Sequence, residues 1–477
     1  MNHRRGLRPG SLAIILLVAS AASPIAASRC PSTRPAKARF RTIAWVSTTC
    51  RTDANGTGGR QELYVQRGDR APVVISQEAT APARDPNRDE LCRGFGQLRY
   101  GLNAVLGGYY PQLAVSPDGR HIAFELNDRF SNFAPDQVTD DVRGLYLARA
   151  DGSDVVKLRP ATSVARYVIL SNGSPSFSSS IAFSPDGRYL VYRDLGPAAD
   201  GTIDAQLWSL RLRDRKTMQL TRLARLPDGI TALEYSFEFA DATTVAFYTL
   251  DNPATSSQPR QRAYSVSVDG ERFRELPSVT LPNGEVIPQF GLAGRRPVVG
   301  GVFVDGTPEN PMPPVDKPRE LFVAFGENVL QLTRFNRVDV GNLGAVVSRD
   351  GRRAYFSASA DPFGCNPTHD CQLFSIDTLG GHLRQLTRFR DSQPSEDGCF
   401  ITPLPGCPVA VFAQDRATGS LIMNSSCDPL GTNPAGEQLF VMRPDGSGLR
   451  QITHARGVVV DTPDVFEVEL PGPSAYQ

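Results

Sequence analysis

The sequence predicts an all-β protein, a seven-bladed β-propeller of four-stranded antiparallel blades, with six blades as the alternative. A hairpin with the turn Ser-x-Asp-Gly recurs at residues 113–125, 181–193 and 345–357. A second signature, an apolar residue and then an aromatic one at the start of a short strand, occurs at Leu63-Tyr64, Leu145-Tyr146, Leu207-Trp208, Ala263-Tyr264, Leu321-Phe322, Leu373-Phe374 and Leu439-Phe440. Repeats of this length indicate units that bury their faces against one another. Four-stranded units repeated around an axis form a propeller.

The recurring turn has the composition of a tight hairpin. Proline at the second position presets φ, aspartate bonds nearby backbone groups, and glycine takes the positive φ that closes the turn. Serine can bond back into the same turn. We therefore expect structural turn formers, and not ligands, at Ser116, Asp118, Gly119, Ser184, Asp186, Gly187, Asp350 and Gly351.

Each unit is expected to contain four strands in order along the chain. An inner strand leads into the Asp-Gly turn, a second strand follows, the aromatic-led strand comes third, and a polar turn leads into an edge strand such as the one at 384–387. The first unit starts at 39–47 with a segment that resembles a second strand, so its inner strand is missing. Residues 458–470 follow the last unit and are expected to supply it. A C-terminal strand would then close the ring.

The chain is expected to form one domain behind an export signal. Arginines precede an apolar run at 12–22 and small residues follow it, which is typical of a signal peptide. We assign residues 1–29 to this signal, 30–470 to a single propeller with an inserted loop at 79–109, and 471–477 to a C-terminal tail. No other segment is long and apolar enough for a transmembrane helix. The expected location is therefore periplasmic or secreted, without a transmembrane anchor.

The charge balance gives no sign of a polyanionic partner. The sequence has 51 Lys and Arg against 50 Asp and Glu, a formal net charge of +1. Such a chain has no strong field of one sign to attract nucleic acid. We therefore expect no nucleic-acid partner, and we expect a monomer.

The eight cysteines of an exported chain are first interpreted as disulfides. Their spacing does not match the short Cys-x-x-Cys pattern of zinc sites. Cys365 and Cys371 could staple one loop, and Cys399 and Cys407 another. The pairing stays open for Cys30, Cys50, Cys92 and Cys427.

Few residues are candidates for catalysis or metal binding. The sequence contains no Gly-x-Ser-x-Gly nucleophile motif. A metal cluster needs about three converging ligands, and the histidines lie at different points of their units: His121, His369, His382 and His454. Two acidic pairs could hold calcium or act as acid and base, Asp140-Asp141 and Asp200 with Asp204. We assign no catalytic residue and no cofactor, and we leave a structural calcium ion open.

The hairpins and the aromatic-led strands resemble the WD40-like (PD40) repeats of TolB-like propellers. The resemblance runs from about residue 38 to 470 and is strongest at 113–125, 181–193, 345–357 and 436–453. It implies an exported propeller that binds proteins or glycans through its loops and central mouth. Similar repeats occur beside peptidases of the prolyl oligopeptidase type and in oligogalacturonate lyases.

Two functions from different classes are therefore considered. We expect a non-enzymatic binding or scaffold propeller that recognises an envelope or extracellular protein, or a glycan. Aromatic residues are favoured at binding hot spots, and the candidates are Tyr109, Tyr110, Phe130 and Phe133. The alternative is an enzyme with its site in the channel, a polysaccharide lyase or hydrolase, because residues that converge from several blades leave no motif.

Overall fold

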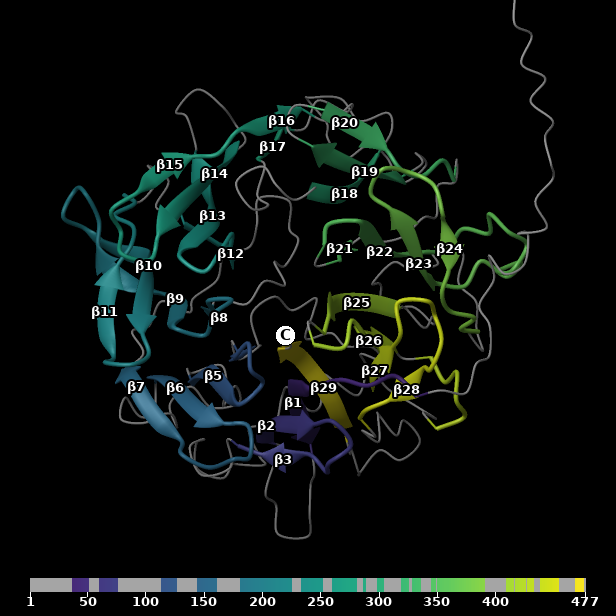
Figure 1. Cartoon of the computed structure of the whole chain (residues 1–477), viewed down its shortest axis with the longest axis horizontal. Helices are drawn as coiled ribbons and strands as arrows, with labels where there is room; N and C mark the ends of the chain where they lie inside the picture. The colour runs from purple at the N-terminus through teal and green to yellow at the C-terminus, as the bar shows by residue number, and fades with distance from the viewer. Residues whose placement is uncertain are drawn as a thin grey trace, which may run out of the picture.

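The computed structural model is all-β, and its sheets stand around an axis as the blades of a β-propeller (Figure 1). None of the described residues belongs to a helix that is long and apolar enough to span a bilayer. The structure describes residues 37–50, 60–75, 113–126, 144–160, 181–224, 233–251, 260–280, 286–288, 298–303, 319–325, 328–335, 345–348, 350–390, 409–415, 417–425, 427–432, 438–453 and 468–475.

Five blades each consist of four consecutive antiparallel strands. The first contains β4 (Leu113–Val115), β5 (His121–Leu126), β6 (Gly144–Arg149) and β7 (Val156–Pro160). The second contains β8 (Ile181–Phe183), β9 (Tyr189–Pro197), β10 (Ile203–Arg211) and β11 (Lys216–Gln219). The third contains β12 (Leu233–Phe239), β13 (Thr244–Asp251), β14 (Arg260–Ser267) and β15 (Phe273–Glu275). The last two are β21 (Val346–Val347), β22 (Arg353–Ala358), β23 (Gln372–Asp377) and β24 (Arg384–Gln385), and then β25 (Val409–Gln414), β26 (Leu421–Ser425), β27 (Gln438–Met442) and β28 (Arg450–Gln451).

A composite sheet joins the two ends of the chain. It contains β1 (Thr42–Cys50), β2 (Arg60–Arg67) and β3 (Val73–Val74) from the N-terminal part, with β29 (Val468–Ala475) paired antiparallel to β1. The C-terminal strand lies where the missing inner strand of the first unit was expected. It starts ten residues later than the predicted segment 458–470, and it includes residues 471–475, which the sequence analysis assigns to a tail.

The remaining strands form two smaller sheets. β16 (Ser278–Thr280) pairs with β17 (Val286–Pro288), and β18 (Val298–Phe303), β19 (Arg319–Phe325) and β20 (Asn328–Gln331) form a three-stranded sheet.

The predicted number of blades is wrong. Within the described ranges the structure shows five blades of four consecutive strands, and neither seven nor six. The prediction counted aromatic-led third strands, and such a strand is present both in β2 of the composite sheet and in β19 of the three-stranded sheet. A third strand can also form in a sheet that lacks one of the other three strands of its unit. The number of third strands therefore differs from the number of complete blades.

Both faces of a blade are buried against its neighbours. In β9, Val191 packs with Phe247 of the following blade, whereas Leu190 and Tyr192 pack with Leu145 of the preceding one. Successive side chains of a strand point to opposite faces, so one strand contributes to two interblade cores. A polar side chain between blades therefore needs a hydrogen-bond or charge partner.

Removal of residues 468–477 should strongly destabilise the fold. Six residue pairs join β29 to β1, and with about one hydrogen bond per pair at about 0.5–1.5 kcal/mol each we expect a loss of roughly 3–9 kcal/mol in the free energy of unfolding. The freed edge of β1 should also promote aggregation. Thermal unfolding would be compared with a control that lacks only residues 476–477. Equal melting temperatures for the two truncated chains would contradict the closing role of β29.

Candidate functional site

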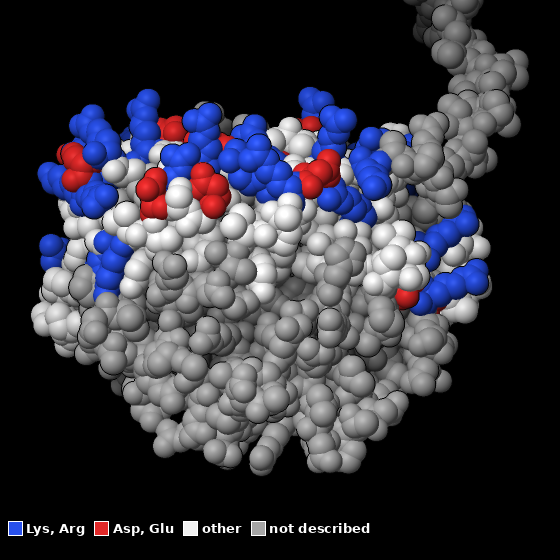
Figure 2. Space-filling model, turned by 90° about the horizontal axis from the view of Figure 1, so that it is seen from below, with Lys and Arg blue, Asp and Glu red and all other residues white. Residues whose placement is uncertain are grey.

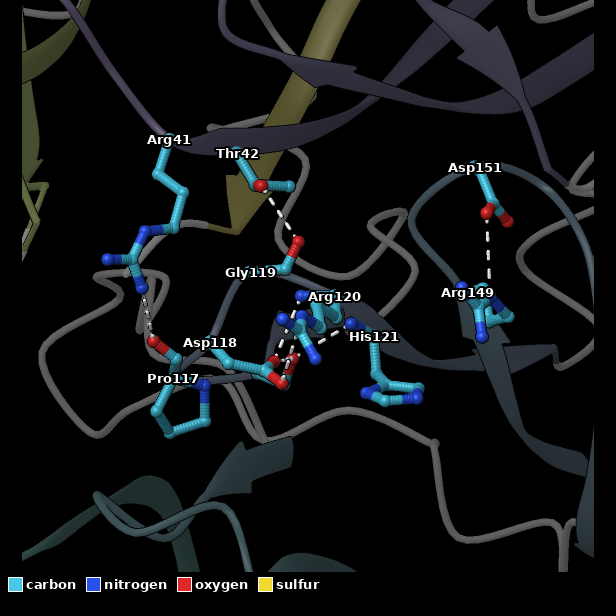
Figure 3. A network of polar contacts seen from close by, with 10 residues as sticks. Arg41, Thr42, Pro117, Asp118, Gly119, Arg120, His121, Arg149 and Asp151 are labelled. Atoms are coloured by element: carbon cyan, nitrogen blue, oxygen red, sulfur yellow. Dashed lines mark hydrogen bonds and ion pairs between the residues drawn. The ribbon is translucent and has the colours of Figure 1, made fainter.

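The recurring Ser-x-Asp-Gly turns use their aspartates internally. Ser116 Oγ donates to Asp118 Oδ1 over 2.7 Å, and the same carboxylate accepts the backbone N–H of Arg120. Gly119 has a φ of 66°. Figure 3 shows this turn against the composite sheet, where Thr42 Oγ1 donates to the Gly119 carbonyl over 2.9 Å.

The second and third turns repeat these contacts. Ser184 donates to Asp186 and Ser348 donates to Asp350, each over 2.6 Å. Hydrogen bonds from Ser348 and from the backbone N–H of Arg352 hold the pKa of Asp350 below its usual range. Gly187 and Gly351 have φ of 70° and 71°. The carboxylates of Asp186 and Asp350 are thus occupied by hydrogen bonds within their own turns.

Other predicted site residues lie outside the described residues. These are Tyr109, Tyr110, Phe130, Phe133, Asp140, Asp141, His454, Cys399 and Cys407. Cys365, Cys371 and Cys427 each take part in a disulfide. The proposed pairing of Cys365 with Cys371 stays a prediction.

The described histidines lie apart from one another. His369 Nδ1 is 3.1 Å from the Ser359 carbonyl, and His382 Nδ1 is 2.6 Å from Asp377 Oδ2. Within the part of the chain that the structure describes, no three His, Cys, Asp or Glu side chains converge on a possible metal position.

The predicted acidic pair of Asp200 and Asp204 is separated by the fold. Asp200 is exposed in the turn between β9 and β10, where hydrogen bonds from the hydroxyl and the N–H of Thr202 lower its pKa. Asp204 lies on β10 and is only 4% exposed. Asp200 is therefore a turn former, and Asp204 is an interior carboxyl.

A different buried carboxyl shares a face with Asp204. The register pairs Asp194 of β9 with Gln206, and Gly196 with Asp204. Directly opposed residues share a face of the sheet, and so do residues two apart. Asp194, 5% exposed, is thus the diagonal neighbour of Asp204, at roughly 7–8 Å between backbones. Both carboxyls face the preceding blade.

Arg159 of β7 reaches this face from the preceding blade. Its Nη2 forms an ion pair with Asp194 Oδ2, and its Nη1 donates to the Tyr192 hydroxyl over 2.7 Å. The guanidinium lies 5.1 Å from the ring centre of Tyr192 and 5.2 Å from that of Trp208. Charge pairing and cation–π contacts therefore hold one arginine against one carboxyl and two aromatic rings.

Burial raises the pKa of Asp194 to about 6, although Arg159 and the N–H of Leu195 act in the opposite direction. Desolvation disfavours the charged carboxylate, and here it outweighs the neighbouring cation. The carboxyl can therefore gain or lose a proton near neutral pH.

Two buried donors of the residues that pack here have no hydrogen-bond acceptor among the described residues. They are the Nε–H of Arg159 and the Nε1–H of Trp208. Gly196 leaves the space for the indole, because a Cβ at residue 196 would come within 2.8 Å of the Trp208 ring. Unpaired buried donors are costly, and a ligand rich in oxygen acceptors would satisfy them.

The corresponding blade β21–β24 lacks half of this arrangement. Gln372 is the counterpart of Gln206, and the residue opposite it is Ala358, where Gln206 has Asp194. Two residues before Gln372 lies Asp370, which is the counterpart of Asp204. Ala358 is fully buried. One blade thus packs an alanine where the other carries an ionisable group.

Perturbed buried carboxyls gather at functional sites, so Asp194, Asp204 and Arg159 form the candidate site.

The sequence contained one signal for this site that motif searching missed. Alignment of the repeats on Ser184 and Ser348 places Asp194 opposite Ala358, and this marks the carboxyl as an exception. Arg159 carries no such signal, because only the packing of β7 on the next blade brings it near.

No protein-family model matches the sequence, and no curated protein matches it. Solved structures do match. An acylaminoacyl peptidase of Pyrococcus horikoshii is 13% identical with a TM-score of 0.45, over 88% of this chain and 52% of the peptidase. An oligogalacturonate lyase in complex with manganese is 14% identical with a TM-score of 0.38, over 90% of this chain and 87% of the lyase. A TolB from Agrobacterium tumefaciens is 15% identical with a TM-score of 0.32, over 62% of this chain and 89% of its own.

These comparisons correct the predicted function. The predicted preference for a non-enzymatic scaffold is contradicted, because the matched propellers include peptidases and lyases beside TolB. The chain spans about half the length of the acylaminoacyl peptidase. Likeness at this identity concerns the fold alone, so any chemistry has to be derived from the residues of this chain.

The raised pKa of Asp194 should make the fold less stable as pH rises. The folded pKa of about 6 lies above the ordinary value near 3.9, so the stabilising contribution is complete below pH 4 and is lost as pH passes 6. Two pKa units correspond to roughly 2–3 kcal/mol. Urea unfolding between pH 4 and 7.5 should show this loss in the native protein and not in Asp194→Asn. Parallel curves for the two proteins would contradict the assignment.

Proposed function

We propose that this chain is an enzyme that cleaves glycosidic bonds of a polysaccharide, with Asp194 and Asp204 as its acid–base pair. The observation that supports the proposal most is a buried carboxyl with a pKa of about 6 on the same face as a second buried carboxyl. Most glycosidases use two such carboxyl groups, one on each side of the scissile bond.

Asp194 is suited to the role of the general acid. A group with a pKa near the working pH combines a useful protonated fraction with the ability to release the proton. It would protonate the oxygen of the leaving sugar. Asp204, which accepts the N–H of Ala205 over 2.8 Å, would act from the neighbouring strand as the base or nucleophile.

Arg159 and Trp208 provide groups for binding a sugar. The Arg159 side chain is 20% exposed and that of Asp194 7%, so the arginine is the more accessible of the two partners. Sugar hydroxyls can accept hydrogen bonds from the unpaired Nε–H of Arg159 and Nε1–H of Trp208. These contacts would orient the glycosidic oxygen toward Asp194.

Family and location are proposals that rest on the sequence. The Ser-x-Asp-Gly turns support membership of the TolB-like propellers with PD40 repeats, and the N-terminal apolar run supports export to the periplasm or the exterior. An exported enzyme would meet polysaccharide as its substrate.

The proposal predicts activity that depends on both carboxyls. A panel of neutral and acidic polysaccharides would be tested for new reducing ends and for the ultraviolet absorbance of unsaturated products, which separates hydrolysis from elimination. Asp194→Asn and Asp204→Asn should each lower kcat/KM at least 100-fold, because general acid–base catalysis contributes about 10²–10⁴-fold. The rate should fall above pH 6, where the acid loses its proton.

Asp370→Asn is the matched control. It removes a buried carboxyl that lies two residues before Gln372, as Asp204 lies two residues before Gln206, in a blade that has Ala358 in place of the second acid. Its activity should equal that of the native protein. Full activity in Asp194→Asn, or no product from any polysaccharide with folded protein, would reject the proposed function.

A further inference from the structure

The turn between β10 and β11 lacks the glycine that three other blades have in the corresponding turn. In the corresponding turns an aspartate precedes a glycine with positive φ, namely Gly152 at 85°, Gly270 at 74° and Gly446 at 86°. In the β10–β11 turn the aspartate is Asp214, and the next residue is Arg215 with a φ of 56°. The left-handed conformation is unfavourable for a side chain other than glycine.

This turn is one residue longer than two of the others, because Arg211 pairs with Lys216 whereas the N–H groups of Arg149 and Arg443 donate to the carbonyls four residues on, but its aspartate accepts a similar hydrogen bond. Asp214 Oδ1 accepts the N–H of Lys216 over 3.3 Å, as Asp151 accepts that of Ser153 over 3.1 Å and Asp445 that of Ser447 over 2.9 Å. Glycine would therefore fit at residue 215 without the strain. The arginine is not explained by the requirements of folding.

The turn has more positive than negative charge. Arg211, Arg213, Arg215 and Lys216 stand against one carboxylate, that of Asp214. Arg211 already binds this carboxylate through Nε at 2.9 Å and Nη2 at 2.6 Å. The Arg213 side chain is 77% exposed and lies 3.9 Å from Asp214. Among the described residues, neither Arg215 nor Lys216 has an ion-pair partner.

A second turn of the same blade adds another cation. The N–H of Leu212 donates to the carbonyl of Arg188 over 2.9 Å and fixes the β10–β11 turn beside the β8–β9 turn. The Arg188 side chain is 77% exposed, whereas its partner Asp186, at 3.4 Å, is 28% exposed. Figure 2 shows that the charged side chains of the described residues gather along one face of the ring, with Lys and Arg standing outermost.

We propose that the basic turn, defined as Arg213, Arg215 and Lys216 with Arg188 beside them, docks this face of the propeller on a bilayer that contains anionic phospholipids. β11 is the outermost strand of its blade (Figure 1), so the turn that leads into it lies at the rim of the ring. Met218, two residues after Lys216 and 38% exposed, adds an apolar side chain to the same strand. Exposed cations beside an apolar side chain suit a charged bilayer surface.

The proposal predicts opposite effects of one substitution on binding and on stability. Arg215→Gly should weaken binding to phosphatidylcholine vesicles with 30% phosphatidylglycerol about five-fold, the effect of one cation near such a surface. It should also raise the Tm by about 1–2 °C, because the strain in the turn is removed. Vesicle sedimentation and thermal unfolding of the whole chain measure both effects.

Arg352→Ala is the matched control. Arg352 follows the Asp-Gly turn of another blade, its side chain is 86% exposed, and it lies outside the basic turn. Its removal should leave vesicle binding within two-fold. The native protein should bind phosphatidylcholine vesicles only weakly, and added salt should reduce binding to the anionic ones.

Three results would overturn the docking proposal. The first is unchanged vesicle binding in Arg215→Gly, and the second is an equal loss in Arg352→Ala. The third is binding of the native protein to heparin but not to anionic vesicles, which would indicate a soluble polyanion as the partner. None of these measurements depends on the proposed catalytic activity.

Discussion

The four-stranded blades are buried against their neighbours on both faces, and this constraint decides which side chains can lie between them. Val191 and Tyr192 are adjacent in β9, yet they pack into two different interblade cores. An ionisable group between blades loses its hydration and has to find a partner in the neighbouring sheet. Arg159 is such a partner for Asp194. The ion pair therefore couples the chemistry of the candidate site to the packing of two blades.

Burial and pairing act in opposite directions on Asp194. An ion pair alone would lower the pKa of the carboxyl, whereas desolvation raises it, and desolvation is the larger effect here. Breaking such a pair leaves an uncompensated charge, so both partners are hard to replace one at a time. The alanine of the corresponding blade, Ala358, shows that the same strand position packs well without any charge. The fold tolerates Asp194 but does not require it.

Local patterns in the sequence predict the hairpin turns and short strands, because their conformation depends on residues that are close in the chain. The Ser-x-Asp-Gly segments lie in hairpin turns with glycine at positive φ, and the aromatic-led segments are strands. The number of complete blades depends on which strands pair, and Gly300 and Gly301 of β18 add no side chains to mark the sheet. The position of β29 could not be derived either, because Pro471 and Pro473 are unfavourable in a strand and only pairing with β1 brings them into one. Arg159 and Asp194 meet only through packing between blades.

Asp194 and Arg215 both depart from the residue types found at these positions in other blades. The first is buried and the second is exposed, but they have one physical feature in common. Asp194 occupies a buried position where alanine packs in another blade, and Arg215 occupies an exposed left-handed position where glycine lies in three others. In each case the residue found in the other blades would lower the free energy of the folded chain. Alanine in place of Asp194 would avoid desolvation of a carboxyl, and glycine in place of Arg215 would avoid backbone strain. A repeat that folds well elsewhere without these residues offers an internal reference for what folding alone requires. Residues that depart from it at a cost to stability are where function is best sought in this chain.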